Sequence, residues 1–342
     1  MLWRKNLLSI PNKLKWQMDN IIDVLIVGGG PIGIACGIEA KKNNLSHVIL
    51  EKGCLTNSLY NYPINMTFFS TSERLEIGDT PFVTTNPKPR RAEALEYYRR
   101  IDKKFDLKTH LFEEVLSINK IEGTFQVSST KSIYRAKNVI VATGFYDIPM
   151  YLGVPGEELE KVRHYYEDPH YYANQKVIVV GASNSSIDAA LETYRKGADV
   201  TLIIRGKEVS PRVKYWVRPD IENRIANSEV KVHYKSEIVS ISERDVLVST
   251  PKGIISIEND FVLALTGYRP NFEFLEKIGI EIPSQAPCIP KHNPDTMETN
   301  IEDLYLAGVV CGGLNTHLWF IENSRIHANI IVKNILSKKS DS

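Results

Sequence analysis

Two runs of apolar residues each lead into a glycine-rich turn and then into a helical pattern. Residues 23–27 are mostly branched aliphatic side chains, and the turn 28–33 follows them. Residues 176–180 and the altered turn 181–186 repeat this order. Runs of this kind are typical of strands buried on both faces of a parallel sheet. The pattern therefore predicts two strand–loop–helix units, each suited to one dinucleotide.

The first glycine turn has the residues that a pyrophosphate loop needs. Gly28 permits the tight turn, Gly30 lets the backbone approach the phosphates, and Gly33 lets the helix pack closely on the strand. Amide groups at the start of that helix then face the phosphates. A second strand at 48–50 ends in Glu51, at about the spacing of roughly 20 residues expected for an acid that binds ribose hydroxyls.

The second turn is followed by a strand at 200–204 that ends in Arg205, where the first unit has Glu51. A carboxylate at this position would repel a 2′-phosphate, whereas a guanidinium can bind one through two hydrogen bonds. The sequence therefore predicts NADP(H) at the second unit. Ser183 replaces the middle glycine and offers a hydroxyl to the phosphates, and Lys207 and Arg212 are nearby cations able to share the role of Arg205.

The rest of the chain divides into further elements. The segment after Glu51 is rich in aromatic and hydroxyl side chains, which suits a cofactor ring or a plain surface loop. Ala94, Tyr98, Ile101 and Phe105 follow the spacing of an amphipathic helix. Short strands at 125–128 and 132–135 predict an antiparallel insertion, and buried strands are expected at 138–144, 260–267 and 303–308. A last helix is expected at 320–336.

These elements predict an α/β fold with two Rossmann-like dinucleotide-binding domains, each with three layers, parallel sheets and small antiparallel insertions. One domain is expected to be discontinuous and to contain residues 20–150 and 267–338. The other is expected at 151–266. Residues 1–19 are interpreted as an N-terminal extension, with Met18 as the true or an alternative start of translation.

Composition limits the classes of binding partner that are expected for this chain. The 342 residues carry 42 basic and 41 acidic side chains, so no large field favours nucleic acid or an anionic membrane. No stretch approaches the roughly 18 apolar residues of a membrane span. Four widely separated cysteines, without metal-like spacing, favour a reducing cytoplasm and predict no metal site. A homo-oligomer is left open.

Several of these motifs together resemble a known family. The turn 28–33, Glu51, the segments 142–144 and 306–308 and the inserted second turn are similar to low-molecular-weight thioredoxin reductases. That resemblance implies FAD at the first site and NADPH at the second. A denser resemblance is to the YpdA-type bacillithiol disulfide reductases. It is carried by residues 58–63, 67–70, 77–79, 87–91, 184–192 and 320–323.

Two departures from these families concern the reactive thiol. The cysteine pair of thioredoxin reductases is absent from residues 164–170, and the cysteine of the YpdA-type first turn is replaced by Ile32. Since a thiolate is the species that attacks a disulfide, another sulfur would have to replace it. Cys36 lies one helical turn after Ile32, and Cys311 follows the Gly308 turn. Both are candidates for a catalytic role, and His317, ahead of the last helix, is a candidate proton donor.

The conclusion is an NADPH-dependent FAD oxidoreductase whose acceptor, by resemblance, is a low-molecular-weight disulfide such as bacillithiol disulfide. Alternatives are a flavin monooxygenase, a ferredoxin or flavodoxin reductase, and a redox-sensing flavoprotein without useful turnover. The residues expected to bind FAD are Gly28, Gly30, Pro31, Ile32, Gly33, Glu51, Lys52, Asn61, Thr143, Gly144 and Gly308. Those expected to bind NADPH are Gly181, Ser183, Asn184, Ser185, Ser186 and Arg205.

Overall fold

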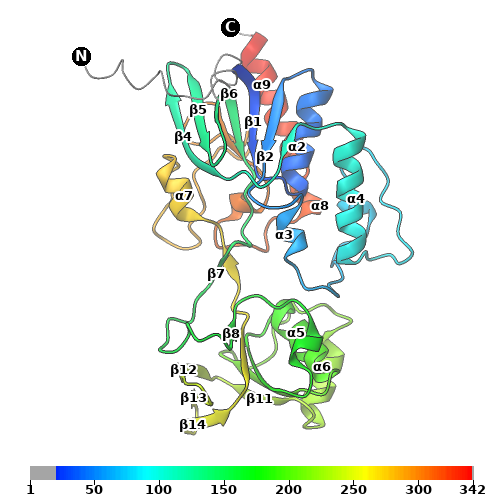
Figure 1. Cartoon of the computed structure of the whole chain (residues 1–342), viewed down its shortest axis with the longest axis vertical. Coiled ribbons are helices and arrows are strands. Elements are labelled where there is room, and N and C mark those ends of the chain that lie inside the picture. Colours follow the sequence, from blue (N-terminus) through cyan, green and yellow to red (C-terminus); the bar gives the residue numbers. More distant parts are fainter. Residues whose placement is uncertain (1–20, 341–342) are drawn as a thin grey trace, which may run out of the picture. The chain divides into compact units, whose positions relative to one another are not determined.

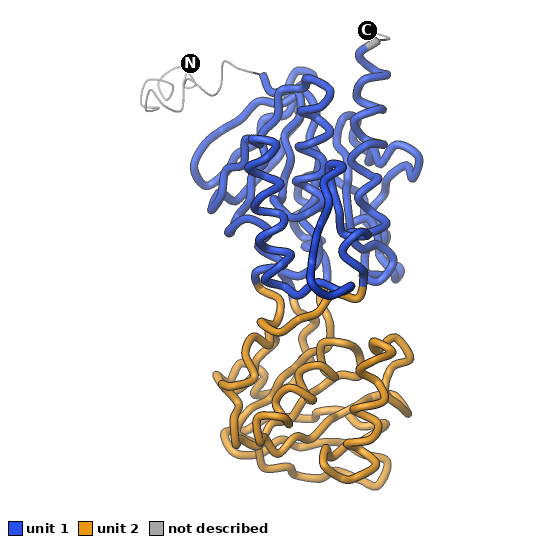
Figure 2. The backbone as a smooth tube through the Cα atoms, turned by 90° about the vertical axis from the view of Figure 1, so that its right-hand side faces the viewer, with its two compact units in different colours: residues 1–60, 70–148, 269–342 blue, residues 61–69, 149–268 orange. Residues whose placement is uncertain are grey.

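The computed structural model describes residues 21–340 and divides them into two compact units (Figure 2). Of these residues, unit 1 contains 21–60, 70–148 and 269–340, and unit 2 contains 61–69 and 149–268. The boundaries expected from the sequence lie two residues away, at 150/151 and 266/267. The grouping of 61–69 with unit 2 was not expected. The extension 1–19 and the alternative start at Met18 lie outside the described residues.

Unit 1 is built on a seven-stranded sheet in the order β3-β2-β1-β6-β5-β4, with β17 also paired to β6 (Figure 1). Neighbours among β3, β2, β1, β6 and β17 run parallel, whereas β4, β5 and the start of β6 form an antiparallel meander. The strands are β1 (Ile21–Val27), β2 (His47–Leu50), β3 (Thr109–His110), β4 (Val115–Ile121), β5 (Thr124–Ser129), β6 (Ile133–Val141) and β17 (Leu304–Leu306).

The antiparallel insertion differs from the expectation in one respect. The short strand at 132–135 and the buried strand at 138–144 were expected to be separate. Both belong to β6, which pairs with β5 through its first residues and with β1 along most of its length. A long strand serves both partners because nothing in 136–137 breaks its extended backbone.

The helices of unit 1 include α2, which packs against α9. The expected amphipathic helix is α4, whose buried face includes Ala94, Tyr98 and Ile101. The single helix expected at 320–336 is wrong in detail, because a break at Arg325 separates α8 from α9. The helices are α2 (Pro31–Lys42), α3 (Asn57–Tyr60), α4 (Arg91–Lys104), α7 (Phe272–Lys277), α8 (Ile321–Ser324) and α9 (Ile326–Ser340), with short 3₁₀ turns at η2 (Glu73–Leu75) and η4 (Val309–Gly312).

Unit 2 has three layers around a parallel sheet in the order β11-β10-β9-β15-β8. Alternate residues of β9 face opposite sides: Val177 and Val179 pack toward Ile187 of α5, and Ile178 and Val180 pack toward Val246 of an antiparallel sheet. The elements are β8 (Val162–Arg163), η3 (Pro169–Tyr172), β9 (Lys176–Val180), α5 (Asn184–Tyr194), β10 (Asp199–Ile204), α6 (Arg218–Ala226), β11 (Lys231–Tyr234), β12 (Glu237–Ile241), β13 (Asp245–Thr250), β14 (Gly253–Glu258) and β15 (Phe261–Ala264).

The fold class expected from the sequence is confirmed, since both units contain a parallel sheet covered by helices. No residue range was predicted for the antiparallel sheet β12-β13-β14 of unit 2. The chain passes between the units within β7 (Ile148–Pro149) and β16 (Tyr268–Arg269), which pair with each other. None of the helices within residues 21–340 has the length and hydrophobicity that crossing a bilayer requires.

Candidate functional site

Four loops meet at the carboxyl edge of the parallel sheet of unit 1. The turn 28–33 follows β1, Glu51 follows β2, Thr143 and Gly144 follow β6, and Gly308 follows β17. Because β2, β1, β6 and β17 are parallel neighbours, these segments lie at one end of the sheet. Open α/β sheets bind their ligands at this edge. Most of the residues expected to bind the first dinucleotide are therefore brought together.

Each glycine of the first turn has a distinct geometric role. Gly28 has a φ of +109°, and a Cβ added there would lie 2.6 Å from the carbonyl oxygen of Ala142. A Cβ at Gly33 would lie 1.9 Å from the carbonyl oxygen of Gly28, so only glycine permits this contact between helix and strand. A Cβ at Gly30 would meet no atom within 4 Å. The open side of the turn is therefore at Gly30.

The helix α2 begins directly behind that open side. Pro31 occupies its first turn, no side chain caps the helix at Gly30, and the first turn contains no acidic residue. Proline suits this position because its missing amide proton would have no helical partner. The positive end of the helix dipole and the amide groups of this turn suit an anion. These residues fit the pyrophosphate of a dinucleotide.

Glu51 is buried and holds the turn by two hydrogen bonds. Its Oε2 accepts from the amide of Gly29 at 2.7 Å and its Oε1 from the amide of Gly53 at 2.8 Å. Only 6% of the residue is exposed. Burial raises the pKa of this carboxyl, and the two amide donors oppose that shift. The carboxylate thus shapes the loop, and its remaining lone pairs are able to accept from ribose hydroxyls.

A cavity lies at this edge, and several of the residues that line it were not predicted from the sequence. It includes the expected Gly28, Glu51, Lys52 and Thr143, and the Lys52 Nζ is 2.8 Å from Oδ2 of Asp147. Glu113 and Glu114 lie three and four residues after the two-residue strand β3, which the sequence did not indicate, so no local cue pointed to them. The missed lining residues are Asn57, Ser58, Glu113, Glu114, Val115, Asp147, Asn271 and Phe274, together with Val27 and Leu50 of the strands.

Asn61 is not brought to this cavity. It begins the segment 61–69, which belongs to unit 2, whereas the first turn belongs to unit 1. In that segment the amide of Ile64 donates to the carbonyl oxygen of Glu167 at 2.9 Å. The neighbouring Asn57 and Ser58, at the start of α3, line the cavity instead.

The side chain of Ile32 lies where a side chain on Gly308 would point. A Cβ on Gly308, whose φ is +86°, would lie 3.3 Å from Cγ1 of Ile32. Ile32 is 9% exposed. The amide of Gly308 donates to Nδ1 of His327 at 3.1 Å, a buried partner on α9 that the sequence did not indicate. The residue that replaces the family cysteine is thus an apolar contact between two loops of the site.

The candidate catalytic side chains are placed differently from one another. Cys36 and Cys311 are 0% and 1% exposed, and burial raises the pKa of the Cys36 thiol to about 12 and that of Cys311 further still. At each thiol a backbone hydrogen bond lowers the pKa, but the effect of burial outweighs it. His317 is exposed and lies ahead of α8, which has four residues, and not ahead of the long helix expected there.

The second turn repeats the construction of the first within unit 2. Gly181 has a φ of +132°, and a Cβ there would lie 2.7 Å from the carbonyl oxygen of Leu265. Ser186 stands where the first turn has Gly33, is fully buried, and donates from Oγ to the carbonyl oxygen of Ser183 at 2.8 Å. Ser183 and Ser185 are exposed at the start of α5. This turn also fits a phosphate group.

The Asn184 side chain holds the loop that follows β10. Its Oδ1 accepts from the amide of Lys214 at 2.8 Å, and its Nδ2 donates to the carbonyl oxygen of Arg212 at 3.2 Å. Lys214 in turn pairs with Asp188 at 2.6 Å. Asn184 thereby positions part of the loop that follows Arg205, which is exposed at the end of β10.

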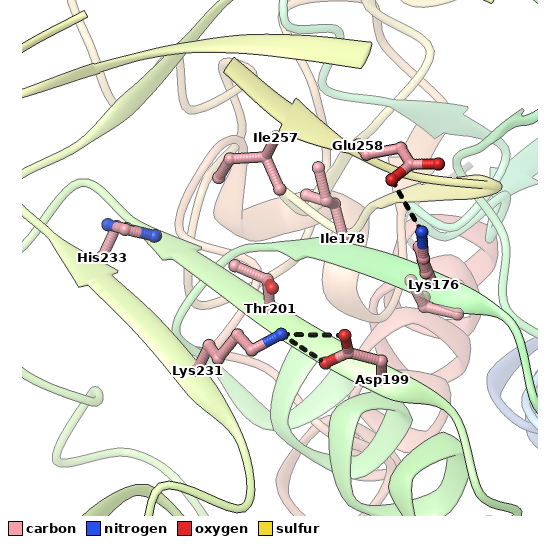
Figure 3. A pocket seen from close by; sticks show the side chains of 9 residues that line it. Lys176, Ile178, Asp199, Thr201, Lys231, His233, Ile257 and Glu258 are labelled. Carbon is pink, nitrogen blue, oxygen red and sulfur yellow. Dashed lines mark hydrogen bonds and ion pairs between the residues drawn. The ribbon is translucent and has the colours of Figure 1, made fainter. Parts of the chain in front are cut away.

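Unit 2 has a cavity at the amino-terminal edge of its sheet, opposite the edge where the second glycine turn lies (Figure 3). Lys176, Asp199 and Lys231 are the first residues of β9, β10 and β11. Lys231 pairs with Asp199 at 2.8 Å and Lys176 with Glu258 at 2.7 Å. Since ligands of open sheets bind at the carboxyl ends of the strands, this amino-terminal cavity is not the nucleotide site.

Comparisons with known proteins agree with this geometry. The family model for pyridine nucleotide-disulphide oxidoreductases matches residues 25–308. Bacilliredoxin reductase Bdr of Bacillus subtilis is 43% identical over 318 residues, which cover 92% of this chain and 98% of that protein. The structure of bacillithiol disulfide reductase Bdr (YpdA) from Staphylococcus aureus has a TM-score of 0.91 at 40% identity, covering 94% of this chain and 99% of that one.

A more distant structure supports the fold alone. The thioredoxin reductase of T. acidophilum has a TM-score of 0.75 at 19% identity and covers 93% of this chain and 99% of its own. The resemblance to thioredoxin reductases and to the YpdA-type proteins, drawn from the sequence, is confirmed by these matches.

Proposed function

The chain belongs to the pyridine nucleotide-disulphide oxidoreductase family, and from this premise we propose that it reduces a low-molecular-weight disulfide. It is a flavoprotein reductase that uses FAD and NADPH. The observation that carries the choice of acceptor is the likeness, over nearly the full length of both chains, to a protein named bacillithiol disulfide reductase. Bacillithiol disulfide is therefore the first acceptor to test. A small redox protein is the second, because another relative is named bacilliredoxin reductase.

The first site is proposed to hold FAD, which when bound takes up electrons from NADPH and passes them to the acceptor. Gly30 leaves open the space that the pyrophosphate needs, and the start of α2 stabilises its charge. Glu51 holds the turn by accepting hydrogen bonds from two backbone amides, and it is also proposed to accept from ribose hydroxyls. Lys52 and Asp147, paired at the cavity, are proposed to flank the adenosine half.

The second site is proposed to hold NADPH. Ser183 and Ser185 offer exposed hydroxyls at the start of α5, and Arg205 is exposed at the end of β10. A guanidinium there is able to bind the 2′-phosphate through two hydrogen bonds. Asn184 is proposed to contribute by holding the 212–214 loop in place through both ends of its carboxamide.

The acceptor is proposed to meet the cofactor without a cysteine of the protein as an intermediate. The chain has four cysteines, of which Cys36 and Cys311 are buried with raised pKa values. Ile32, in the first turn, provides an apolar surface and no sulfur. This arrangement would also serve a one-electron carrier, so acceptor identity has to be measured.

The test compares acceptors and nicotinamides on the purified holoprotein. We expect a yellow protein whose NADPH oxidation is stimulated by bacillithiol disulfide more than by ferredoxin, flavodoxin or oxygen. Stimulation by ferredoxin or flavodoxin alone would assign a reductase of one-electron carriers, and oxygen use with an organic substrate would assign a monooxygenase. A protein that cannot be loaded with flavin would refute the proposal.

Arg205→Ala tests the nicotinamide site separately. Loss of charge-assisted hydrogen bonds should raise KM for NADPH roughly 10- to 100-fold and leave KM for NADH unchanged. Lys207→Ala is the comparison variant, because Lys207 is also exposed and lies two residues from Arg205. A larger rise in KM for NADPH in Lys207→Ala than in Arg205→Ala would mean that Lys207, and not Arg205, binds the 2′-phosphate.

A further inference from the structure

His327 is a buried imidazole on α9 with contacts on several sides. Only 1% of the residue is exposed. Its Nδ1 accepts from the amide of Gly308 at 3.1 Å, and Sγ of Cys311 lies 4.0 Å from the same nitrogen. The ring of Trp319 meets it edge-on, with 4.6 Å between centroids and 75° between planes. The imidazole is therefore held in one orientation.

The hydrogen bond to Gly308 determines where the imidazole carries its proton. A neutral imidazole has one donor and one acceptor nitrogen, so acceptance at Nδ1 places the proton on Nε2. Nε2 is buried and has no hydrogen-bond partner among residues 21–340. Burial lowers the pKa of His327 to about 4, which keeps the ring neutral near pH 7. A buried donor without a partner costs stability, so this histidine is poorly explained as packing alone.

Gly308, the partner of His327, belongs to the edge where the cofactor loops converge. It follows β17, which is parallel to β6 as β6 is to β1. Its φ of +86° is a conformation that residues with a Cβ rarely adopt. On its other side, a Cβ added to Gly308 would lie 3.3 Å from Cγ1 of Ile32 in the turn 28–33. The amide of Gly308 thus points to α9 while its α-carbon faces the first turn.

We propose that His327 is a positioning residue of the FAD site. By accepting the amide of Gly308, Nδ1 of His327 holds the 308 turn against Ile32, and so fixes the wall that this turn and the loop 28–33 form together at the carboxyl edge. This inference rests on the proposed function, since it requires FAD at that edge. His327 does not itself touch the cofactor in this proposal.

Loss of the acceptor at His327 would change the direction in which the amide of Gly308 points. Without an acceptor at His327, the buried amide of Gly308 has to find another partner. The available change is a rotation of the 307–308 peptide, which would move the α-carbon of Gly308 from Ile32. Both the affinity for FAD and its midpoint potential would then change, because each depends on the groups around the ring system.

Two substitutions test the role of the Nδ1 acceptor separately from that of the rest of the ring. Asparagine carries its Oδ1 at the position of Nδ1, whereas glutamine carries its Oε1 near the position of Nε2. We expect His327→Asn to keep the Kd for FAD within about threefold of the wild type, and His327→Gln to raise it roughly five- to tenfold, the effect of one lost hydrogen bond. The midpoint potential of bound FAD should shift in His327→Gln only. Equal behaviour of the two variants would overturn the proposal.

A matched control is His47→Gln. His47 is also buried, also has an Nε2 without a partner, and begins β2 at the opposite, amino-terminal edge of the same sheet. Its substitution should lower the melting temperature of the protein and leave both the Kd for FAD and the potential unchanged. A change in FAD affinity as large as that of His327→Gln would show that these readouts report stability alone.

A spectroscopic test needs neither FAD nor activity. In the ¹⁵N spectrum of the flavin-free wild-type protein, Nδ1 of His327 should have the shift of an unprotonated nitrogen and Nε2 that of a protonated one. A proton on Nδ1 would overturn the proposal, even if both variants failed to fold. If the spectrum agrees but the wild-type protein binds no FAD, the proposed function has failed and not the hydrogen bond.

Discussion

At the scale of single residues, burial decides which side chains of the site are charged. Cys36 and Cys311 are kept as thiols, because their pKa values are raised by the loss of solvent. The same effect keeps His327 neutral by lowering its pKa. Glu51 differs, since two backbone amides donate to its carboxylate and oppose the effect of burial on its pKa. The two thiols and the imidazole are therefore neutral near pH 7, while the Glu51 carboxyl holds the first turn.

The four cysteines should react differently with thiol reagents. We expect Cys36 and Cys311 to resist alkylation in the native protein, because both are almost fully buried, while the half-buried Cys54 and Cys288 react. Mass spectrometry after timed alkylation measures this. The double variant Cys36→Ala, Cys311→Ala should keep disulfide reductase activity within about threefold, as expected for residues outside the chemistry. Loss of activity with FAD retained would instead restore a catalytic role to one of them.

His327 should make stability depend on pH. Its pKa is about 4 in the folded protein and near 6.5 in an unfolded chain. Between these values the unfolded chain binds more protons, so the contribution to the free energy of unfolding is complete above pH 6.5 and decreases as the pH falls toward 4. Between pH 7 and pH 5 this amounts to about 2 kcal/mol.

Urea unfolding of the flavin-free protein measures that contribution. The wild type should lose about 2 kcal/mol more than His327→Asn between pH 7 and pH 5, since the variant lacks the titrating group. The comparison cancels the carboxylates that both proteins share. An equal loss in the two proteins would mean that His327 is accessible to protons in the folded state.

At the scale of elements, the two strand–loop–helix units use the same plan with different residues at the closest contact. In the first unit Gly33 packs against the carbonyl oxygen of Gly28, where no Cβ fits. In the second unit Ser186 occupies this place, and its Cβ would lie 3.0 Å from a Cβ on Gly181. Its hydroxyl donates to the carbonyl oxygen of Ser183 and so satisfies one backbone group of the turn. The second turn therefore tolerates a side chain that the first does not.

Two glycines of the first turn should respond in opposite ways to alanine. Gly30→Ala should change the stability of the flavin-free protein by less than about 1 kcal/mol, because its φ is −74° and its Cβ would enter open space. Its affinity for FAD should fall at least about tenfold, since that space is proposed to hold the pyrophosphate.

Gly33→Ala should instead destabilise the flavin-free protein by roughly 3 kcal/mol or more, because its Cβ would lie 1.9 Å from a carbonyl oxygen. Thermal unfolding and FAD titration distinguish the two effects. Normal FAD binding by Gly30→Ala would place the pyrophosphate elsewhere.

At the scale of the whole molecule, the chain passes between the two units four times. The passages at 148–149 and 268–269 connect the units as expected for an inserted domain. The other two enclose the segment 61–69, which leaves unit 1 after α3 and is held in unit 2 by bonds such as that from Ile64 to Glu167. Asn65 adds a contact of 3.4 Å to Glu192, which also accepts from the hydroxyl of Tyr166. This segment should open and close with unit 2.

Hydrogen exchange tests that coupling through two matched core truncations. Ile203→Ala removes buried volume in unit 2, and Ile26→Ala removes it in unit 1. Each should cost about 2–5 kcal/mol. Exchange of the Ile64 amide should accelerate in Ile203→Ala and stay close to wild type in Ile26→Ala, because local opening follows the cooperative unit that contains the amide. The reverse result would assign 61–69 to unit 1.

The sequence by itself determined the features whose signals lie close together along the chain. Strand, glycine turn and helix follow one another within about 30 residues, so periodicity and residue type were sufficient to predict both units, the tight turn at Gly28 and the close packing at Gly33. Local patterning also predicted α4. It was insufficient for β12-β13-β14 and for the break at Arg325, because pairing and packing with distant segments decide these.

Only the tertiary structure decided what surrounds each candidate side chain. Cys36 and Cys311 are separated by most of the chain, and their burial follows from the packing of α2 and η4 in the core. The same holds for the hydrogen bond between Gly308 and His327, and for the grouping of Asn61 with unit 2. Burial and hydrogen bonding depend on residues that are distant in sequence. A motif therefore identifies which chemistry is available, while the folded environment determines which atoms are free to perform it.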